Sequence, residues 1–267
     1  MRSIVRLARS AAIVGSFIFF GFGSAWLSFV YLPWVRWRTP PEQRAERSQL
    51  AVHRGFRFFL RVVAFVQRYD LEIDAQGADA IDGPYVLMAN HPTLIDVILL
   101  TAAHRRLVSV VKGEYYRVPV LRPLLRQCAY IDGADRSPSA LEALIEQSVE
   151  RLREGVSVLA FPEGTRSRPG ELRPFRRAPF EIAAVAGVPI RPAAIFVDPP
   201  TLTGHEPWYR PSEPVSRFRI KYLPLIEVGP GRRGAKAAML EVERVIREQL
   251  ELFRLQASHG IRDRSRK

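Results

Sequence analysis

The sequence predicts an α/β fold with a mostly parallel central sheet flanked by helices, preceded by an N-terminal membrane-embedded hydrophobic helix and an amphipathic helix. Three observations predict this architecture. Short apolar runs alternate with stretches of helical periodicity from about residue 70 onward, as in βαβ units. An uncharged apolar run occupies residues 10–35. A basic stretch with apolar residues at helical spacing joins these two parts.

The apolar run is long enough to enter a membrane. Its 26 residues would measure about 39 Å as a helix, against about 30 Å for a hydrocarbon core. Aromatic residues stand at its far end, where the headgroup layer favours them: Trp26, Tyr31, Trp34 and Trp37. A cleaved signal peptide is the alternative, with residues 23–25 as the small-residue site. The apolar run continues past that site, so we expect an anchor.

Residues 36–70 carry eight arginines against three acidic residues, a net charge of +5. The apolar spacing predicts an amphipathic helix over residues 43–69, suited to the membrane interface. A core helix of the globular domain would show the same periodicity. Basic residues flank the apolar run on both sides, so residues 10–35 either span the membrane or form a shallow hairpin with both ends cytoplasmic.

The remaining elements follow from the alternating pattern. Strands are expected at Leu71–Asp74, Tyr85–Ala89, Leu107–Lys112, Ala129–Asp132, Ser157–Phe161, Ile190–Val197 and Arg217–Tyr222. Helices are expected at Leu94–Ala103, Ser139–Glu154, Phe175–Ala186 and Ala235–Leu255. The Pro-rich run Pro199–Pro214 is typical of a long surface loop. The predicted division is a membrane-anchoring part at 1–70, a catalytic domain at 71–230, and a C-terminal helix with a basic tail at 231–267.

Composition narrows the functional classes. The 267 residues suffice for one domain with a sizeable core. Lys and Arg number 40 against 27 Asp and Glu, a net charge of +13, which attracts nucleic acid or an anionic membrane. The single cysteine, Cys128, excludes an internal disulfide and a cysteine-built metal cluster. It lies in an apolar strand, a poor setting for a nucleophile.

The first candidate site is the segment from Asn90 to Asp96, after the apolar strand 85–89. Ligands usually bind at the carboxyl ends of strands in open α/β sheets. His91 would stand in the strand-to-helix turn, and Asp96 just over one turn into the helix. The carboxylate could then hold one imidazole nitrogen and leave the other as a general base. The alternative is a helix N-terminus with His91 as an ordinary, hydrogen-bonded polar residue.

The second candidate site is Phe161–Ser167, which follows another apolar strand. Gly164 lets the backbone approach a ligand, and Thr165 supplies a hydroxyl. Arg166 offers a two-pronged donor for phosphate or carboxylate. Glu163 could orient Arg166 or accept a hydrogen bond from a substrate hydroxyl. The alternative is a polar turn with an internal pair between Glu163 and Arg166.

Together these segments resemble the lysophospholipid acyltransferase family, whose best-known members are the 1-acyl-glycerol-3-phosphate acyltransferases. The resemblance covers about residues 70–225. It rests on the order and spacing of several short motifs: Asn90–Asp96, Lys112-Gly113-Glu114, Tyr130-Ile131-Asp132, Phe161–Ser167, Phe175-Arg176-Arg177 and Val188–Pro192. The N-terminal pair of helices also resembles the membrane-docking helices of bacterial members.

This resemblance implies direct transfer of an acyl group from acyl-CoA or acyl carrier protein to the hydroxyl of a lysophospholipid. The expected acceptor is 1-acyl-glycerol-3-phosphate, giving phosphatidic acid. His91 matches the catalytic base and Asp96 its orienting partner. The residues expected to bind substrate are Asn90, Thr93, Lys112, Arg136, Glu163, Gly164, Thr165 and Arg166. No cofactor is implied besides the thioester co-substrate, and no metal, since the His and acidic residues lack ligand spacing.

Three positions depart from the family pattern, and the first of them bears on the acceptor. An arginine usually follows the Ile-Asp of the second motif, whereas Gly133 follows it here and Arg136 is the nearest arginine. The glycine usual near the end of the Lys-x-Glu stretch is Arg122, and Thr93 replaces a common serine. The missing arginine leaves a different lysolipid or a specialised lipid intermediate as an alternative acceptor.

The expected location is the cell inner membrane, with the active site at the cytoplasmic face and membrane lipids, not nucleic acid, as partners. A basic membrane-bound nucleic-acid binder without catalysis is the rival from another class. The arginine-rich stretches flank or follow the hydrophobic segment, as membrane-surface binding predicts. An inactive lipid-binding member of the family is a second rival, against which the intact His91 and Asp96 argue.

Overall fold

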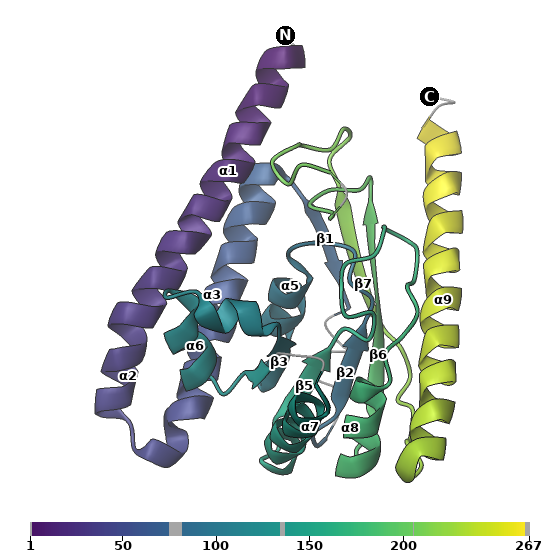
Figure 1. Cartoon of the computed structure of the whole chain (residues 1–267). Coiled ribbons are helices and arrows are strands. Elements are labelled where there is room, and N and C mark those ends of the chain that lie inside the picture. Colours follow the sequence, from purple (N-terminus) through teal and green to yellow (C-terminus); the bar gives the residue numbers. More distant parts are fainter. Residues whose placement is uncertain (1, 75–81, 134–136, 205, 265–267) are drawn as a thin grey trace.

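The computed structural model contains a seven-stranded sheet with helices on both faces (Figure 1). It describes residues 2–74, 82–133, 137–204 and 206–264. The strands are β1 (Asp70–Ile73), β2 (Val86–Ala89), β3 (Leu107–Val111), β4 (Ile131–Asp132), β5 (Ser157–Ala160), β6 (Ile190–Asp198) and β7 (Arg217–Tyr222). The helices are α1 (Arg2–Trp26), α2 (Leu32–Arg38), α3 (Arg44–Gln67), α5 (Asp96–Ala103), α6 (Leu121–Gln127), α7 (Pro138–Arg153), α8 (Ala178–Ala186) and α9 (Gly231–Arg264).

The strand order is β1-β7-β6-β2-β5-β3-β4. The strands from β6 to β4 run parallel, and β7 and β1 run antiparallel to them. The predicted fold class is therefore confirmed. Side chains alternate between the two faces: Leu87 and Ala89 face the cluster with α3 and α5, whereas Val86 and Met88 face the cluster with α8 and α9. These short, fully buried strands are typical of parallel sheets.

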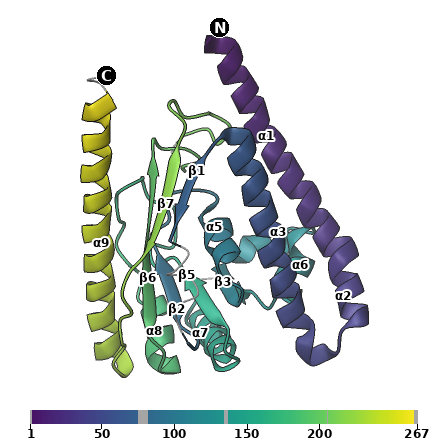
Figure 2. The same ribbon diagram turned by 180° about the vertical axis from the view of Figure 1, so that it is seen from behind.

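The N-terminal helices form a long pair against the first face of the sheet. A π-helical turn at Leu27–Tyr31 joins α1 to α2, and α3 then returns alongside α1 (Figures 1 and 2). One side of this pair is buried, with Ile13 2%, Leu32 0% and Val35 4% exposed. The other side exposes large apolar residues: Ile18, Phe19, Phe22, Trp26, Phe29, Val30, Trp34 and Trp37. Within the described residues, Ser3–Arg38 is the segment long and apolar enough to cross a membrane.

Helix α3 combines the two interpretations that its periodicity allows. Its inner side packs into the core through Val52, Phe59, Leu60 and Val63, as a core helix does. Its outer side exposes arginines and apolar side chains together: Arg54, Arg57, Phe58, Arg61, Phe65 and Val66. The helix is therefore integral to the domain and still presents an amphipathic outer face.

The elements between residues 113 and 133 differ from expectation. A 3-10 turn at Gly113–Arg117 and helix α6 occupy a segment for which the sequence predicted no helix. Strand β4 begins at Ile131 because Ala129 ends the preceding helix with a left-handed φ of 55°, a conformation that a strand does not contain. Two further helices differ at their ends: α8 begins at Ala178, with Pro179 in its first turn, and α9 extends to Arg264.

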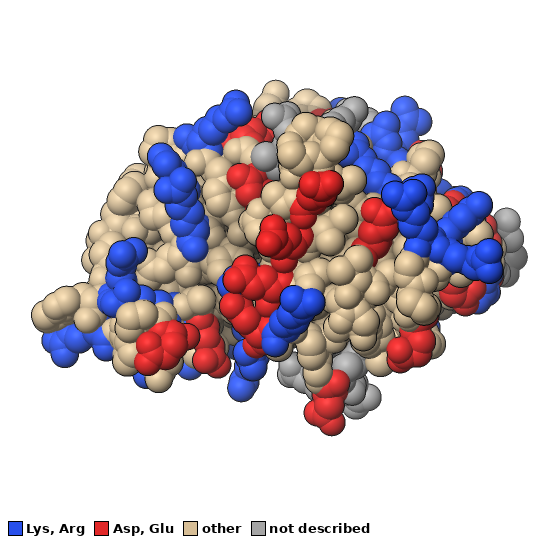
Figure 3. Space-filling view, turned by 60° about the horizontal axis from the view of Figure 1, so that its bottom comes forward, with Lys and Arg blue, Asp and Glu red and all other residues tan. Residues whose placement is uncertain are grey.

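Helix α9 runs along the face of the sheet opposite α1 and α3 (Figure 2). Figure 3 brings the bottom of Figure 1 forward and shows acidic side chains as a band across the middle of that face. Helix α7 contributes exposed glutamates at intervals of four residues: Glu142, Glu146, Glu150 and Glu154. On this face the positive net charge therefore does not form the continuous basic surface that nucleic-acid binding requires.

Candidate active site

The turn between β2 and α5 places His91 and Asp96 in direct contact. The imidazole Nδ1 of His91 lies 2.7 Å from Oδ2 of Asp96. The Asp96 carboxylate is fully buried, whereas the His91 side chain is 19% exposed. A buried carboxylate that accepts from Nδ1 fixes the tautomer with Nε2 as the basic nitrogen. The geometry is therefore that of an oriented general base within reach of a ligand.

Thr93 completes the partners of Asp96. Its backbone N–H donates to Oδ2 at 2.7 Å, and its hydroxyl donates to Oδ1. Thr93 is itself fully buried. Its hydroxyl thus holds the carboxylate in place, and the substrate contact expected for Thr93 stays a prediction that this geometry does not favour.

Glu163 joins the two motif loops. Oε1 accepts from the backbone N–H of His91 at 3.0 Å and from the Ser167 hydroxyl at 3.3 Å. Oε2 accepts from the backbone N–H of Arg173 at 2.7 Å. Burial raises the pKa of Glu163, and these hydrogen bonds offset part of that effect. Both carboxylate oxygens are occupied by the protein, so Glu163 acts here as a clasp between loops.

Two further contacts fix His91. Its ring stacks on Phe161 with centroids 4.1 Å apart and an interplanar angle of 20°. Its backbone carbonyl accepts from the Ser167 N–H at 2.9 Å. Since β2 and β5 are neighbours in the sheet, their following loops meet at its carboxyl edge, as the motif order predicts.

Asn90 anchors the start of the turn to a third strand. Its amide nitrogen donates to the Ile195 carbonyl at 2.8 Å, and its amide oxygen accepts from the Ile195 N–H at 2.7 Å. The side chain is fully buried. Both functional atoms of Asn90 are thereby engaged with β6, so the substrate role expected for Asn90 is not favoured by this geometry either.

The loop that follows β5 and holds Phe161–Ser167, here called the third-motif loop, carries several arginines. Gly164 adopts a φ of +68°, and a Cβ there would lie 2.5 Å from the Arg176 side chain, so glycine is needed. Thr165 and Arg166 follow it and are half-buried. The Glu163–Arg166 pair considered above does not form within the described residues. Further arginines that follow are exposed: Arg168, Arg173, Arg176 and Arg177. Of these, Arg173 donates to the Arg166 carbonyl at 3.3 Å, and Arg177 pairs with Glu181 at 3.4 Å.

Two further predicted site residues belong to the segment between β3 and α7. Lys112 directly follows β3 and forms a loose, exposed pair with Glu114 at 4.0 Å. Arg136 lies outside the described residues. Gly133 follows β4, and a Cβ there would lie 2.8 Å from Cγ1 of Val110 and 3.2 Å from the Val111 carbonyl. An arginine at 133 would therefore require its neighbours to move.

The chemistry of the remaining candidates is limited. Cys128 is completely buried, and burial raises its thiol pKa far above the usual range, so it is a poor nucleophile. In the part of the chain that the structure describes, no group of three His, Cys, Asp or Glu residues is arranged to hold a metal ion.

Sequence reasoning missed two residues at the site. Phe161 was part of a recognised motif, but its stacking on His91 had no signal beyond its position before Pro162. Leu202 contacts the turn from the Pro-rich loop, since its carbonyl accepts from the Leu94 N–H at 2.9 Å. No local pattern marks a residue that acts through its backbone from about a hundred positions away.

Comparison with known proteins supports an acyltransferase. Residues 70–196 match the protein-family model described as Acyltransferase. A chloroplastic 1-acyl-sn-glycerol-3-phosphate acyltransferase of Brassica napus is 28% identical over 143 residues, 52% of this chain and 42% of that protein. Human 1-acyl-sn-glycerol-3-phosphate acyltransferase alpha is 31% identical over 129 residues, 46% of this chain and 45% of that protein. This chain thus spans less than half the length of these relatives.

A solved structure shares the whole architecture. The crystal structure of the 1-acyl-sn-glycerophosphate acyltransferase of Thermotoga maritima superposes with a TM-score of 0.66, covering 95% of this chain and 98% of that chain, at 20% identity. At that identity the likeness concerns the fold. The resemblance predicted from the motifs is confirmed, and residues 70–196 form an acyltransferase-like domain.

Proposed function

We propose that this acyltransferase-like enzyme moves a fatty acyl group from a thioester to the free hydroxyl of a lysophospholipid. The observation that carries the proposal is the buried Asp96 carboxylate, which holds the part-exposed His91 imidazole 2.7 Å away. The relatives' names support 1-acyl-glycerol-3-phosphate as acceptor and phosphatidic acid as product.

The mechanism follows from this orientation. Nε2 of His91 removes the proton of the acceptor hydroxyl as the oxygen attacks the thioester carbonyl carbon. The tetrahedral intermediate then collapses and the carbon–sulfur bond breaks. The departing thiolate takes up the proton that the imidazolium carries. The Asp96 carboxylate stabilises that imidazolium through its hydrogen bond to Nδ1. Transfer is direct, so no acyl-enzyme forms.

The anionic part of a substrate is expected at the third-motif loop. Arg166 is half-buried beside the His91–Glu163 clasp, and its guanidinium can bind phosphate through two parallel hydrogen bonds. Gly133 stands where the family pattern has an arginine, so we expect Arg166 and its neighbours to supply phosphate contacts. A lysolipid other than 1-acyl-glycerol-3-phosphate stays the alternative acceptor, because the phosphate contacts differ from the family pattern.

The packing of the N-terminal segment supports a membrane placement. The segment contacts the domain at two points: Arg9 of α1 donates to the Ser212 carbonyl at 2.7 Å, and Ser28 of the π-helical turn after α1 donates to the Val120 carbonyl at 2.5 Å. Because the segment is attached to the domain at both Arg9 and Ser28, it lies along the domain. Its exposed apolar side is then suited to lie in the plane of the membrane interface. Burial of Ile13 in the fold argues against removal of this segment as a signal peptide.

A cavity of about 400 Å³ between α1 and α3 supports a lipid substrate at this side. Its lining is mostly aromatic and apolar, including Phe19, Phe56 and Phe58, with Arg54 beside them. We place the enzyme at the inner membrane, with the active site facing the cytoplasm, where acyl-CoA and acyl carrier protein are found. Membrane lipids are its expected partners.

Purified full-length protein tests the function. We expect transfer to 1-acyl-glycerol-3-phosphate, or to another lysophospholipid, from acyl-CoA or acyl carrier protein. The two donors are assayed separately, since both carry the same thioester. Failure with every lysophospholipid and both donors would contradict the proposal.

Surface charge tests the membrane placement. Phe22→Glu places a charge on the exposed apolar side of α1, and Leu240→Glu does so on α9, where the leucine is 57% exposed. Only the first should weaken vesicle binding, and a high-salt wash should leave the wild type bound. Equal effects of the two substitutions would refute the placement.

A further inference from the structure

The loop between β6 and β7 crosses the catalytic turn. Because β6 lies beside β2 and parallel to it, its carboxyl end brings the loop that begins at Pro199 to the edge of the sheet that holds His91. The Leu94 N–H donates to the Leu202 carbonyl there, at 2.9 Å. Gly204 lies against Arg166: a Cβ added at Gly204 would be 3.6 Å from the guanidinium carbon. The loop thus touches both the general-base turn and the predicted anion-binding arginine.

Each backbone N–H of the turn from His91 to Leu94 has a separate anchor. The His91 N–H is held by Glu163, the Thr93 N–H by Asp96, and the Leu94 N–H by Leu202. Position 92 is proline and has no N–H. The Leu202 carbonyl is therefore the group through which this loop holds the backbone of the turn.

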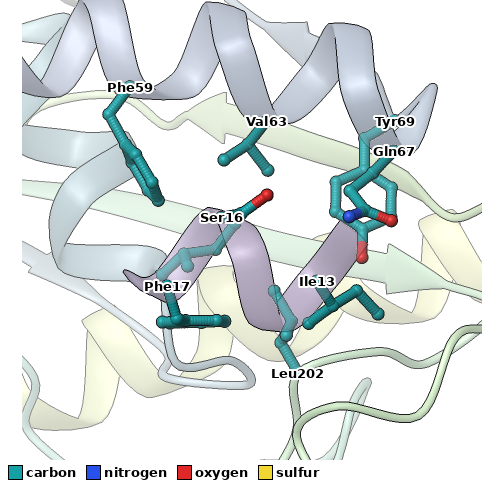
Figure 4. Close-up of a pocket in the computed structure, with 9 residues that line it drawn as sticks. Ile13, Ser16, Phe17, Phe59, Val63, Gln67, Tyr69 and Leu202 are labelled. Carbon is teal, nitrogen blue, oxygen red and sulfur yellow. The ribbon is translucent and has the colours of Figure 1, made fainter. Parts of the chain in front are cut away.

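Leu202 is held in an unfavourable backbone conformation. Its φ is +54°, a region that bulky L-residues rarely adopt and that persists where the surroundings enforce it. Its side chain is 4% exposed. Figure 4 shows it reaching from the loop toward Ile13 and Phe17 of α1. The remaining gap is about 10 Å³, so these side chains are close-packed and a shift of one is felt by the others.

Further contacts attach the same loop to α1. Trp208 packs edge-on against Phe17 with ring centroids 5.0 Å apart. Arg9 donates to the Ser212 carbonyl at 2.7 Å. Packed side chains therefore connect the membrane-facing helix to the catalytic turn, from Phe17 through Leu202 to Leu94.

We propose that Leu202 is a positioning residue through which the packing of α1 sets the geometry of the His91–Asp96 turn. Its side chain is locked by α1, and its carbonyl holds the amide that precedes Ile95 and Asp96. This proposal deepens the acyl transfer proposed above and rests on it. It gives α1 a role in catalysis beyond attachment to the membrane.

Substitutions at Leu202 separate its side chain from its backbone strain. Leu202→Ala removes the packed side chain, and Leu202→Gly removes it while also relieving the strain at positive φ. We expect both to lower kcat about 10- to 100-fold with little change in acceptor KM, since a misplacement of about 1 Å costs up to about 100-fold. Leu202→Met keeps the volume and should stay within about twofold of wild type. Leu152→Ala, equally buried on α7, should lower the melting temperature and leave kcat unchanged.

A double-mutant cycle tests the coupling to α1. Phe17→Ala should reproduce the kcat loss of Leu202→Ala, and the double variant should be no worse than the worse single one. Additive losses in the double variant would overturn the proposal. A wild-type kcat in Leu202→Gly, which lacks the packed side chain, would overturn it as well. If the wild type shows no transfer at all, the proposed function fails. Hydrogen exchange of the Leu94 amide then still tests the positioning role of Leu202. Phe17→Ala and Leu202→Ala should accelerate that exchange, and unchanged exchange would refute the positioning role.

Discussion

The turn after β2 and the loop after β5 lie side by side at the carboxyl edge of the sheet, and their polar groups differ in one respect. In the turn, the groups around Asp96 are buried and paired: two donors come from Thr93 and one from His91. In the loop, the guanidinium groups of Arg166, Arg168 and Arg176 form no ion pair with a carboxylate of the described residues.

This difference separates two tasks. A proton-transfer group must be held in one orientation, so its partners belong to the protein and exclude water. A binding cation must keep its donors free until a ligand supplies the acceptors. Substitutions in the turn should therefore lower kcat, whereas substitutions of the loop arginines should act on substrate binding.

The largest effect is expected for His91→Ala. It removes the proposed general base, and such a base is worth roughly 10²- to 10⁴-fold in rate. Turnover of purified protein measures it, with a melting curve to show that the fold is intact. Residual activity above about a tenth of wild type would be incompatible with general-base catalysis, and the turn would then be structural.

Asp96→Asn should cost somewhat less, about 100-fold in kcat, because the amide can hold the wrong imidazole tautomer while His91 remains. The amide also presents a donor to Thr93, which offers donors of its own. Steady-state kinetics distinguish this from a binding defect, since the acceptor KM should change little. A variant with normal kcat would show that His91 needs no orienting carboxylate.

The motifs made this part of the site predictable. His91, Asp96 and Glu163 are close in sequence to strand ends that the apolar runs identify, so topology alone brings them together. The strands were found for the same reason, since buried runs such as 86–89 and 157–160 are strongly patterned. The roles of Asn90 and Thr93 were not predictable, because a side chain's partner depends on packing that spacing does not encode.

Other features depended on long-range contacts. Leu202 acts through a carbonyl and a packed side chain, neither of which has a sequence signature. Helix α6 was missed: it has only seven residues and carries Pro123 in its first turn, where a proline is tolerated. The π-helical turn at Leu27–Tyr31 likewise has no apolar period that distinguishes it from the helices around it.

Arg166→Lys sharpens the comparison from the side of the loop. Lysine keeps the charge but loses one of two parallel hydrogen bonds, about 1.5 kcal/mol or roughly tenfold in kcat/KM. The loss should appear mainly in the KM of one substrate, which identifies the one that carries the anion. Arg153→Lys, an exposed arginine in the last turn of α7, is the matched control. Equal kinetics for both variants and wild type would remove Arg166 from the binding site.

The smallest effect concerns the clasp that joins the two regions. Burial raises the pKa of Glu163 above 4.5 despite its hydrogen bonds, so the folded protein keeps this proton at a pH where the unfolded chain has lost it. The free energy of unfolding contributed by this group should then fall as the pH rises from about 4.5 to the folded pKa, and stay level beyond it. Glu163→Gln has no such proton. The melting temperature of wild type relative to Glu163→Gln should therefore decrease across that pH range. If the melting temperature of wild type relative to Glu163→Gln instead rises with pH, the hydrogen bonds donated by His91, Ser167 and Arg173 outweigh the effect of burial on the pKa. The folded protein would then favour the ionised form of Glu163.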